Sequence, residues 1–427
     1  MSNRAWPTEK IGALFDIGAG KSMSPAARLG EKQYPFLRTS NVFWGRVDLT
    51  TLDTMNFSES EIETKSLKKG DLLVCEGGDI GRSAIWRDEV EKCGFQNHIH
   101  RLRPKSGDIV PCFVMYYLQA GFTQLGIYEG AGNKTTIPNL SRNRLADLEV
   151  PKPPKPEQEK IAAVLWKVQR AIQMEEKLVA AARELKQSAM RQLFTRGLRG
   201  ERQKETEIGP IPKSWDLHRL EDCCDVVSSS LSYTDFSQMA EENGGESVLA
   251  VGIKVSDMNL SGNELRIVKA NLEKRVPHAL AKRKFVPPNT IVFPKRGAAI
   301  ATNKKRLTMS WTVLDPNLIG VRAGEGVNSN YLFQWFQQFD LRTITEAGPT
   351  PQLNKKNLTP LLLPIPKQPD EQKEIADILE TIDRKISVHE RKRGALGDLF
   401  QTLLHQLMTA QIRVHRLDID TSEVKTA

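Results

Sequence analysis

Two long segments of the chain carry apolar residues at alternating steps of three and four. They span residues 157–197 and 371–412, and the first contains neither Pro nor Gly until Gly197. Such a 3.5-residue repeat is typical of a helix that pairs with another helix in a coiled coil. The positions that we predict to form the pairing seams are Ile161, Leu165, Val168, Ile172, Ile375, Leu379, Ile382, Ile386, Leu396 and Leu403.

Each seam becomes polar near its middle, at Glu175 in the first segment and at His389 and Arg393 in the second. A polar residue inside a seam can fix the register and orientation of two helices. A single isolated helix of this length would leave its apolar stripe in water, so the pattern favours an antiparallel pair. The alternative is that each helix packs only on the globular part of the chain that precedes it.

The rest of the chain has shorter apolar runs, such as "DLLVC" and "FVMYYL", between Gly-rich turns. This pattern is typical of a mixed α/β domain. We therefore expect two similar globular domains of mixed α/β fold separated by two long helices. The expected boundaries are 1–155 for the first domain, 156–200 for the central helix, 201–367 for the second domain, 368–413 for the C-terminal helix and 414–427 for a flexible tail.

The junction between globular domain and helix is written twice. "PKPPKPEQEKIAAVLWKV" begins at Pro151 and "PIPKQPDEQKEIADILETI" at Pro364, and Glu157 aligns with Glu371 at an offset of 214. Proline restricts the backbone before the helix, and the acids that follow suit the positive end of a helix. The duplication predicts a pseudo-twofold internal repeat.

Weaker matches extend the repeat upstream. At an offset of 219, "GDLLVCEGGDIGR" from Gly70 aligns with "NTIVFPKRGAAIA" from Asn289, and "CFVMYYLQ" aligns with "YLFQWFQQ". Trp6 aligns with Trp215 at an offset of 209. Insertions in surface loops produce small changes of offset of this kind.

Composition narrows the class of protein. The chain has 427 residues, of which 39% are hydrophobic, and a net charge of +9. No apolar run is long enough for a membrane helix, and the N-terminus lacks the apolar core of a signal peptide. The five cysteines contain no CxxC pair, so we expect a cytoplasmic protein without a disulfide framework or a metal site.

The sequence contains no recognisable catalytic motif. "GAGKS" at Gly18 resembles the end of a phosphate-binding loop, but Phe15 stands where that motif needs Gly. His98 and His100 have the spacing of ordinary strand positions. We expect no catalytic residues and no cofactor bound by this chain.

Positive charge is concentrated in the second half. Between Lys274 and Arg306 there are ten Lys or Arg residues and no acid, which favours a surface that faces phosphates. A solvated surface without a partner is the alternative. The candidate DNA-binding residues are Arg82, Arg101, Arg103, Lys134, Arg142, Lys282, Arg283, Lys295, Arg296, Asn303, Lys304, Lys305 and Arg306.

These features closely resemble the specificity subunits of type I restriction–modification systems over essentially the whole chain. The resemblance rests on "GPIPKSW" at Gly209, "FLRTSNV" at Phe36, "GDLLVCEGGDIGR" at Gly70 and the two long junction segments from Pro138 and Pro351. It implies that each globular domain reads one half of a bipartite sequence in double-stranded DNA. It also implies that the helices set the gap.

The resemblance further implies partners that do the chemistry. Two methyltransferase subunits would dock on the chain and use S-adenosylmethionine, and two restriction subunits would use ATP with Mg²⁺. The second domain departs from the typical pattern, because "NTIVFPKRGAAIA" replaces a "GDLLVCEGGDIGR"-like segment. The alternatives are a non-catalytic two-headed scaffold for another ligand and a fused restriction enzyme. The absence of methyltransferase and nuclease motifs counts against the second.

Overall fold

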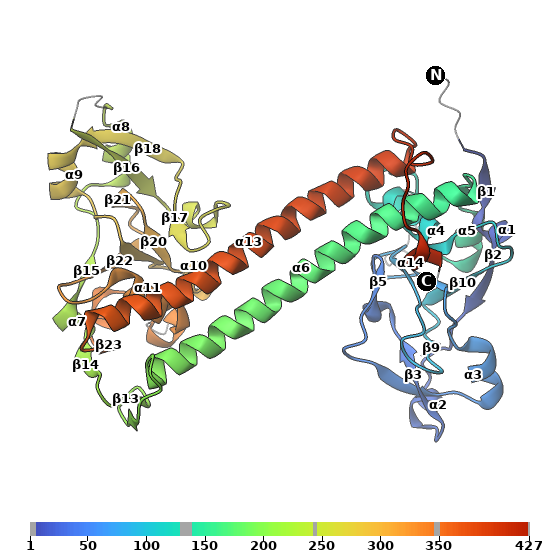
Figure 1. The fold of residues 1–427 in the computed structure, drawn as a ribbon, viewed down its shortest axis with the longest axis horizontal. Coiled ribbons are helices and arrows are strands. Elements are labelled where there is room, and N and C mark those ends of the chain that lie inside the picture. Colours follow the sequence, from blue (N-terminus) through green and yellow to red (C-terminus); the bar gives the residue numbers. More distant parts are fainter. Residues whose placement is uncertain (1–5, 129–138, 242–245, 346–350, 426–427) are drawn as a thin grey trace. The chain divides into compact units, whose positions relative to one another are not determined.

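The structure is a computed structural model that describes residues 6–128, 139–241, 246–345 and 351–425 (Figure 1). The chain divides into two compact units, unit 1 with residues 1–177 and 389–427 and unit 2 with residues 178–388. The long helices α6 (Lys155–Arg196) and α13 (Pro369–Met408) each contribute one half to either unit. Each unit also holds one globular part, which we call its head.

The elements of unit 1 outside the long helices are β1 (Thr8–Lys10), α1 (Ile11–Leu14), β2 (Phe15–Ala19), α2 (Pro25–Leu29), β3 (Gln33–Leu37), η1 (Thr39–Asn41), β4 (Val42–Phe43), β5 (Arg46–Val47), β6 (Asp53–Asn56), α3 (Glu59–Lys65), β7 (Leu72–Cys75), β8 (Ser83–Ile85), β9 (Gly94–Phe95), β10 (Ile99–Pro104), α4 (Pro111–Thr123), α5 (Arg142–Asp147), β11 (Glu149–Pro151) and α14 (Ser422–Lys425).

The elements of unit 2 outside the long helices are β12 (Gln203–Lys204), β13 (Ile211–Pro212), β14 (Asp216–Arg219), α7 (Leu220–Cys223), β15 (Cys224–Val227), α8 (Tyr233–Gln238), β16 (Ser247–Ile253), η2 (Asp257–Asn259), β17 (Arg266–Ile267), β18 (Leu272–Pro277), α9 (His278–Lys284), β19 (Thr290–Pro294), α10 (Ala298–Ala301), β20 (Arg306–Thr308), β21 (Trp311–Leu314), β22 (Leu318–Ala323), α11 (Ser329–Gln338), η3 (Leu341–Ile344), α12 (Lys355–Leu358) and β23 (Leu362–Ile365).

The two heads share one mixed α/β topology. The main sheet has the order β2-β10-β7-β8 in the first head and β15-β22-β19-β20-β17 in the second. A smaller three-stranded sheet, β6-β3-β9 or β18-β16-β21, lies in each head. A two-stranded sheet joins the start of each head to the strand before the long helix, β1 with β11 and β14 with β23. The predicted internal repeat is therefore confirmed.

The registers of the sheets agree with the sequence alignment. Strands β7 and β19 are buried at every residue, as expected for a central strand that is covered on both faces. Gly70 and Asn289, which precede them, both adopt left-handed backbone angles with φ of 86° and 62°. The offset of 219 therefore holds for these strands. The helices α4 and α11 begin at N-caps Val110 and Asn328, so their offset is 218, one residue less than the sequence suggested.

A buried glutamine joins each head to the helix that follows it. In unit 1 the side chain of Gln158 accepts a hydrogen bond from the backbone N–H of Val110 at 2.8 Å and donates to the carbonyls of Asp108 and Pro153. In unit 2 Gln372 accepts from Asn328 at 2.8 Å and donates to Gly326 at 2.9 Å. Both glutamines are buried, and each pairs the backbone N–H of the N-cap residue at the start of a head helix.

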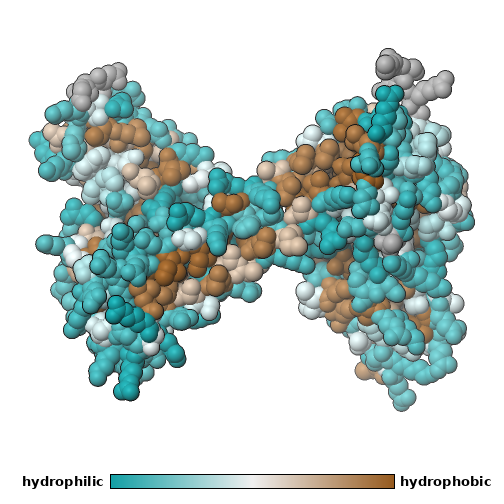
Figure 2. All heavy atoms as spheres, in the orientation of Figure 1, coloured by the Kyte–Doolittle hydropathy of each residue, from teal (hydrophilic) through white to brown (hydrophobic). Residues whose placement is uncertain are grey.

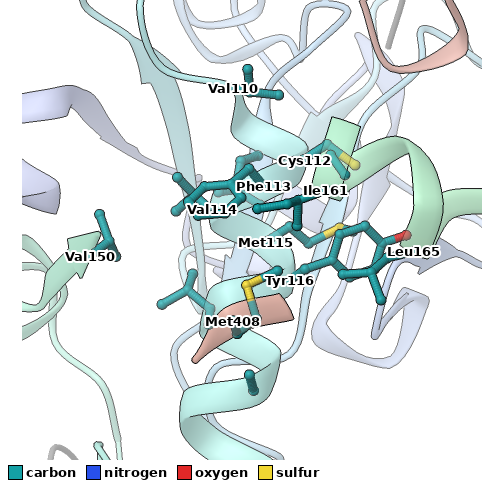
Figure 3. Close-up of a cluster of buried hydrophobic side chains, with 14 of the residues drawn as sticks. Val110, Cys112, Phe113, Val114, Met115, Tyr116, Val150, Ile161, Leu165 and Met408 are labelled. Atoms are coloured by element: carbon teal, nitrogen blue, oxygen red, sulfur yellow. The ribbon is translucent and has the colours of Figure 1, made fainter. Parts of the chain in front are cut away.

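The sequence left open whether the long helices pack on each other or on the globular heads, and the structure shows both kinds of packing. In unit 1, Ile161 and Leu165 pack on Phe113 and Tyr116 of α4 (Figure 3), and the same core contains Phe400 and Leu404 of α13. In unit 2, Ile375 and Leu379 share a core with Met190, Phe194 and Tyr331. Each half of the helix pair therefore packs on its partner and on its own head. The remaining predicted seam residues Val168, Ile172, Ile386, Leu396 and Leu403 are half-buried, and Ile382 is buried.

Polar residues of the two helices pair within each unit, as an antiparallel arrangement requires. The predicted seam residue Arg393 is exposed instead, and Lys392 pairs in its place. Glu175 of α6 bonds His389 at 2.6 Å and Lys392 at 2.7 Å of α13 in unit 1. The Lys392 ammonium and, to a smaller extent, His389 hold the pKa of Glu175 below its usual value. In unit 2, Lys186 of α6 contacts Asp383 of α13 at 2.6 Å.

The units differ at one set of repeated positions where head and helices meet. In unit 1 the hydroxyl of Tyr116 donates to Gln169 at 2.7 Å, and its ring lies 6.0 Å from that of Phe400. The corresponding residues in unit 2 are Gln334, Asp383 and Lys186. There the amide of Gln334 donates to Asp383 at 2.9 Å, and Asp383 also binds Lys186. An aromatic cluster in one unit is thus an ionic cluster in the other.

The C-terminal tail, which the sequence suggested would be flexible, packs along α6. Arg413 donates two hydrogen bonds to the buried carboxylate of Glu157, at 2.5 and 2.8 Å. The indole of Trp166 donates to Glu423 at 2.8 Å, and Val414 and Val424 are buried in the core of unit 1. Isolated apolar residues in a polar stretch gave no periodic signal, which is why the sequence did not reveal this packing.

We predict that Gln158→Ala destabilises unit 1 by about 3 kcal/mol, because it leaves the buried Val110 N–H and the buried Pro153 carbonyl without this partner. Hydrogen exchange followed by mass spectrometry should show faster exchange in α4 while α11 stays protected. Gln372→Ala should have the opposite pattern. The exposed Gln187 of α6 provides the control, and its change to Ala should alter neither head. Equal exchange in all three variants would contradict the role of these glutamines.

Candidate nucleic-acid interface

Three arginine candidates of the first head serve the head itself. Arg103 forms a two-point ion pair with the buried Asp71, with Nε–Oδ1 and Nη2–Oδ2 distances of 2.8 and 2.7 Å. Arg101 is buried and lies 3.1 Å from Asp16. A Cβ at Gly18 in "GAGKS" would come within 2.6 Å of the Arg101 guanidinium, so the glycine leaves room for this side chain. Arg82 is mostly buried and donates to the carbonyl of Thr39 at 3.2 Å.

Arg142 is the one described candidate of this head that lies exposed, at the start of α5. Its neighbour Arg144 is exposed as well. Lys134 lies outside the described residues. The first head therefore presents few of the cations that its sequence suggested. Asp16 and Asp71 bind Arg101 and Arg103, while the Thr39 carbonyl and the nearby Asp79 bind Arg82.

The turn from Asn303 to Arg306 holds helix α11 in place. Lys305 is buried, and its ammonium donates to the carbonyl of Phe339, the C-cap of α11, at 2.5 Å. The amide of Asn303 also donates to this carbonyl and accepts from the N–H of Leu341. Burial lowers the pKa of Lys305 to about 8. This lysine cannot be the surface contact to phosphate that the charge pattern predicted.

The other cations of this turn are also engaged. Arg306 is half-buried and donates to the carbonyls of Lys305 and Met258 at 2.9 and 3.2 Å. Burial lowers the pKa of its guanidinium. Lys304 binds the side chain of Asn259. The turn is thus a structural clamp between the main sheet and α11.

Exposed cations of the second head lie first on α9. Lys282 and Arg283 are exposed in its last turn, and so is Lys284, which the candidate list did not include. The helix packs on the smaller sheet through the buried Ala281. Three neighbouring cations on one short helix give a compact positive surface that suits a phosphate backbone.

A second set of cations borders the loop after β19. Arg296 is exposed and Lys295 half-exposed. Two backbone hydrogen bonds tie this loop to the segment before α12, from Gly297 to Pro351 and from Leu353 to Lys295, each 2.9 Å long. That segment leads into the exposed Lys355 and Lys356 of α12.

The same loop is tied in the same way in the first head, where Leu140 donates to the carbonyl of Glu76 at 2.7 Å. Sequence analysis missed Lys355, although the repeat aligns it with the candidate Arg142 at an offset of 213. Both heads thus place a cation from α5 or α12 beside the loop that follows the central strand. The loops themselves differ, with "EGGD" in one head and "KRGA" in the other.

The described residues were also compared with the requirements of a catalytic histidine, a metal site and a membrane helix. His100 is buried, donates to the carbonyl of Leu140 at 2.8 Å, and has a pKa lowered by burial. Within the described part of the chain, no three His, Cys, Asp or Glu residues are grouped as metal ligands. None of the described helices is both long and apolar enough to cross a membrane.

Comparison with known proteins identifies relatives over nearly the whole chain. The model of the type I restriction modification DNA specificity domain matches twice, at residues 3–183 and 212–396. The MjaVIII and MjaIX type I restriction enzyme specificity subunits of Methanocaldococcus jannaschii are 23% and 24% identical. The alignments cover 97% and 96% of this chain and 94% of each relative. A crystal structure of the S subunit of a type I restriction-modification system from M. genitalium shares the fold with a TM-score of 0.62, at 16% identity over 95% of this chain and 97% of that one.

We predict that Lys305 makes the stability of unit 2 rise with pH. Its pKa is about 8 in the folded chain and near 10.5 when unfolded, so between these values the unfolded state binds more protons. Relative to Lys305→Met, the unfolding free energy of the parent should increase by up to about 3 kcal/mol from pH 8 to pH 10.5. Denaturant unfolding at several pH values measures this difference. Lys304→Met is the control, and a pH-independent difference for Lys305→Met would contradict the assignment.

Proposed function

The chain belongs to the family of type I restriction–modification DNA specificity proteins, and we propose that it is the subunit through which such a complex recognises its DNA target. The observation that carries the proposal is the duplication. Each match to the family model covers one head together with part of the long helix that follows it. A chain with two copies of a DNA specificity domain is suited to read a target in two parts.

Each head would read one half-site. The heads share strand order and register, while the loops after their central strands differ in charge and sequence. Each mismatched base pair costs about 1–3 kcal/mol, so one short half-site gives limited discrimination and two give more. The exposed cations Lys282, Arg283, Lys284 and Arg296 would contact phosphates and position the second head, since phosphate contacts carry no sequence information.

The long helices would set the gap between the half-sites. The joints at Gln158 and Gln372 attach each head to its helix through buried hydrogen bonds, so a head follows the helix to which it is fixed. The helices α6 and α13 are 42 and 40 residues long and continuous. A gap set by helices would change when both helices are lengthened.

Repeated apolar residues on the helices suggest where methyltransferase subunits dock. Leu185 and Val388 are 58% and 50% exposed in unit 2, and their repeat counterparts Leu399 and Met174 are 45% and 54% exposed in unit 1. Judged by the Lys186–Asp383 and Glu175–Lys392 pairs, the two residues of each unit lie within about two turns of each other. Figure 2 shows apolar side chains at the surface along the helices. Two equivalent patches suit two methyltransferase subunits.

The chemistry would belong to these partners. We assign S-adenosylmethionine to the methyltransferase subunits, and ATP with Mg²⁺ to two restriction subunits of the complete complex. The chain itself would contribute recognition and assembly in the cytoplasm.

A genome-wide map of methylated adenines in the source cells, with the gene intact and deleted, tests the proposal. We predict that a bipartite motif with one fixed gap disappears on deletion. Restoring the gene with Lys282, Arg283 and Lys284 changed to Gln should lower methylation at all copies of the motif without altering its sequence. Co-purified methyltransferase with an unchanged map would refute the role in recognition.

We predict that Leu185→Asp and Leu399→Asp each weaken the docking of one methyltransferase subunit by at least about tenfold, because a charge replaces a buried apolar contact. Native mass spectrometry of the co-expressed subunits should show one bound copy in each single variant and none in the double variant. Gln187→Asp, on the same helix as Leu185, is the control. Two bound copies in the double variant would place the docking surface elsewhere.

A further inference from the structure

A charged cleft lies in unit 2 where α6 ends and α13 begins. Its volume is about 670 Å³. Four carboxylates line it, those of Glu201, Asp370, Glu371 and Glu374, together with the cations Arg199 and Lys367. Lys367 also lies 3.7 Å from Asp216. The acids outnumber the cations, so the cleft favours a positively charged occupant.

The internal repeat shows which cation the corresponding place in unit 1 binds. Glu157, the counterpart of Glu371, is only 3% exposed, and both its oxygens accept from the guanidinium of Arg413. The same guanidinium lies 5.5 Å from the ring of Trp6. Arg413 is held through its planar group, with Nε and Nη2 as the donors.

The carboxylate of Glu371 keeps room for another donor. Its oxygens accept one hydrogen bond each, from the N–H of Leu198 at 3.2 Å and from the indole of Trp215 at 3.3 Å. Each carboxylate oxygen can accept a second hydrogen bond. Glu371 is half-buried in the wall of the cleft, whereas Glu157 is sealed by its arginine.

The chain's own arginine does not occupy this place. Arg199 is the repeat counterpart of Arg413, but it is exposed and lines the cleft. The reason lies in the chain that follows. After Arg413 the tail runs along α6 and buries Val414, whereas after Arg199 the chain turns into the hairpin of β12 and β13.

We propose that the cleft at Glu371 receives an arginine side chain from a partner subunit, in the way that Glu157 receives Arg413. The proposal rests on the proposed function in one respect, that the chain works within a complex. A guanidinium fits because its donors lie in a plane and can bind a carboxylate at two points while Glu374 or Asp370 adds charge. Lysine, with a compact ammonium, lacks this two-point geometry.

The test uses the full chain labelled with ¹⁵N-tryptophan and the probe N-acetyl-arginine amide. The indole N–H of Trp215 bonds Glu371 and reports on the cleft, while Trp6 reports on the filled counterpart. We expect the probe to shift the Trp215 signal in a saturable manner and to leave Trp6 unchanged. N-acetyl-citrulline amide, which has the same shape without the charge, should shift neither. Glu371→Gln should abolish the Trp215 response.

Arg413→Ala supplies the matched control, because it vacates the carboxylate of Glu157. In this variant the probe should shift Trp6 as well as Trp215. A Trp215 signal that never responds, or that responds equally to citrulline, overturns the proposal. Its outcome is independent of the methylation map, since no partner or DNA is present. If the Trp215 signal responds to the probe but the methylation map is unchanged on deletion of the gene, the arginine site is supported and the proposed function is refuted.

Discussion

Two buried glutamines are the constraint on which each half of the structure depends. Gln158 and Gln372 lie at the starts of the long helices, and each bonds the backbone at the start of the main helix of its head. A helix start leaves N–H groups without partners inside the helix, and burying them unpaired is costly. A glutamine at this position allows the start of a head helix to pack against the start of a long helix in a buried environment.

The same constraint explains why the repeat is most evident at the junction and weakest elsewhere. Away from the joint the two units solve the same packing problem with different chemistry, Tyr116, Gln169 and Phe400 in one and Gln334, Asp383 and Lys186 in the other. If the two helix halves were exchanged between the units, the phenyl ring of Phe400 would meet the carboxylate of Asp383. The ammonium of Lys186 would likewise meet the aromatic cluster of unit 1. Buried ionic groups add little stability, but they favour one pairing over its alternatives.

The sequence predicted the parts that depend on periodicity and repetition. The long paired helices, the contact between Glu175 and His389 and the offset of 219 between central strands all follow from local pattern and are present in the structure. The sequence could not predict which cations are exposed, because exposure depends on partners far along the chain. Arg103 pairs with Asp71, and Lys305 bonds the C-terminal end of α11, only in the folded chain. The packing of the C-terminal tail could not be predicted for the same reason, since Arg413 binds a carboxylate 256 residues earlier in the chain.

The division of the chain into its units also sets an order of synthesis. Unit 2 is one continuous stretch, whereas unit 1 takes residues 1–177 and then residues 389–427. On the ribosome, the first head emerges long before Phe400, Leu404 and Arg413, which complete its core and neutralise Glu157. The second half can finish folding while the first still waits for its last segment. A chain that stopped soon after residue 388 would thus carry an intact second head and an unfinished first one, because the segment that completes unit 1 begins at residue 389.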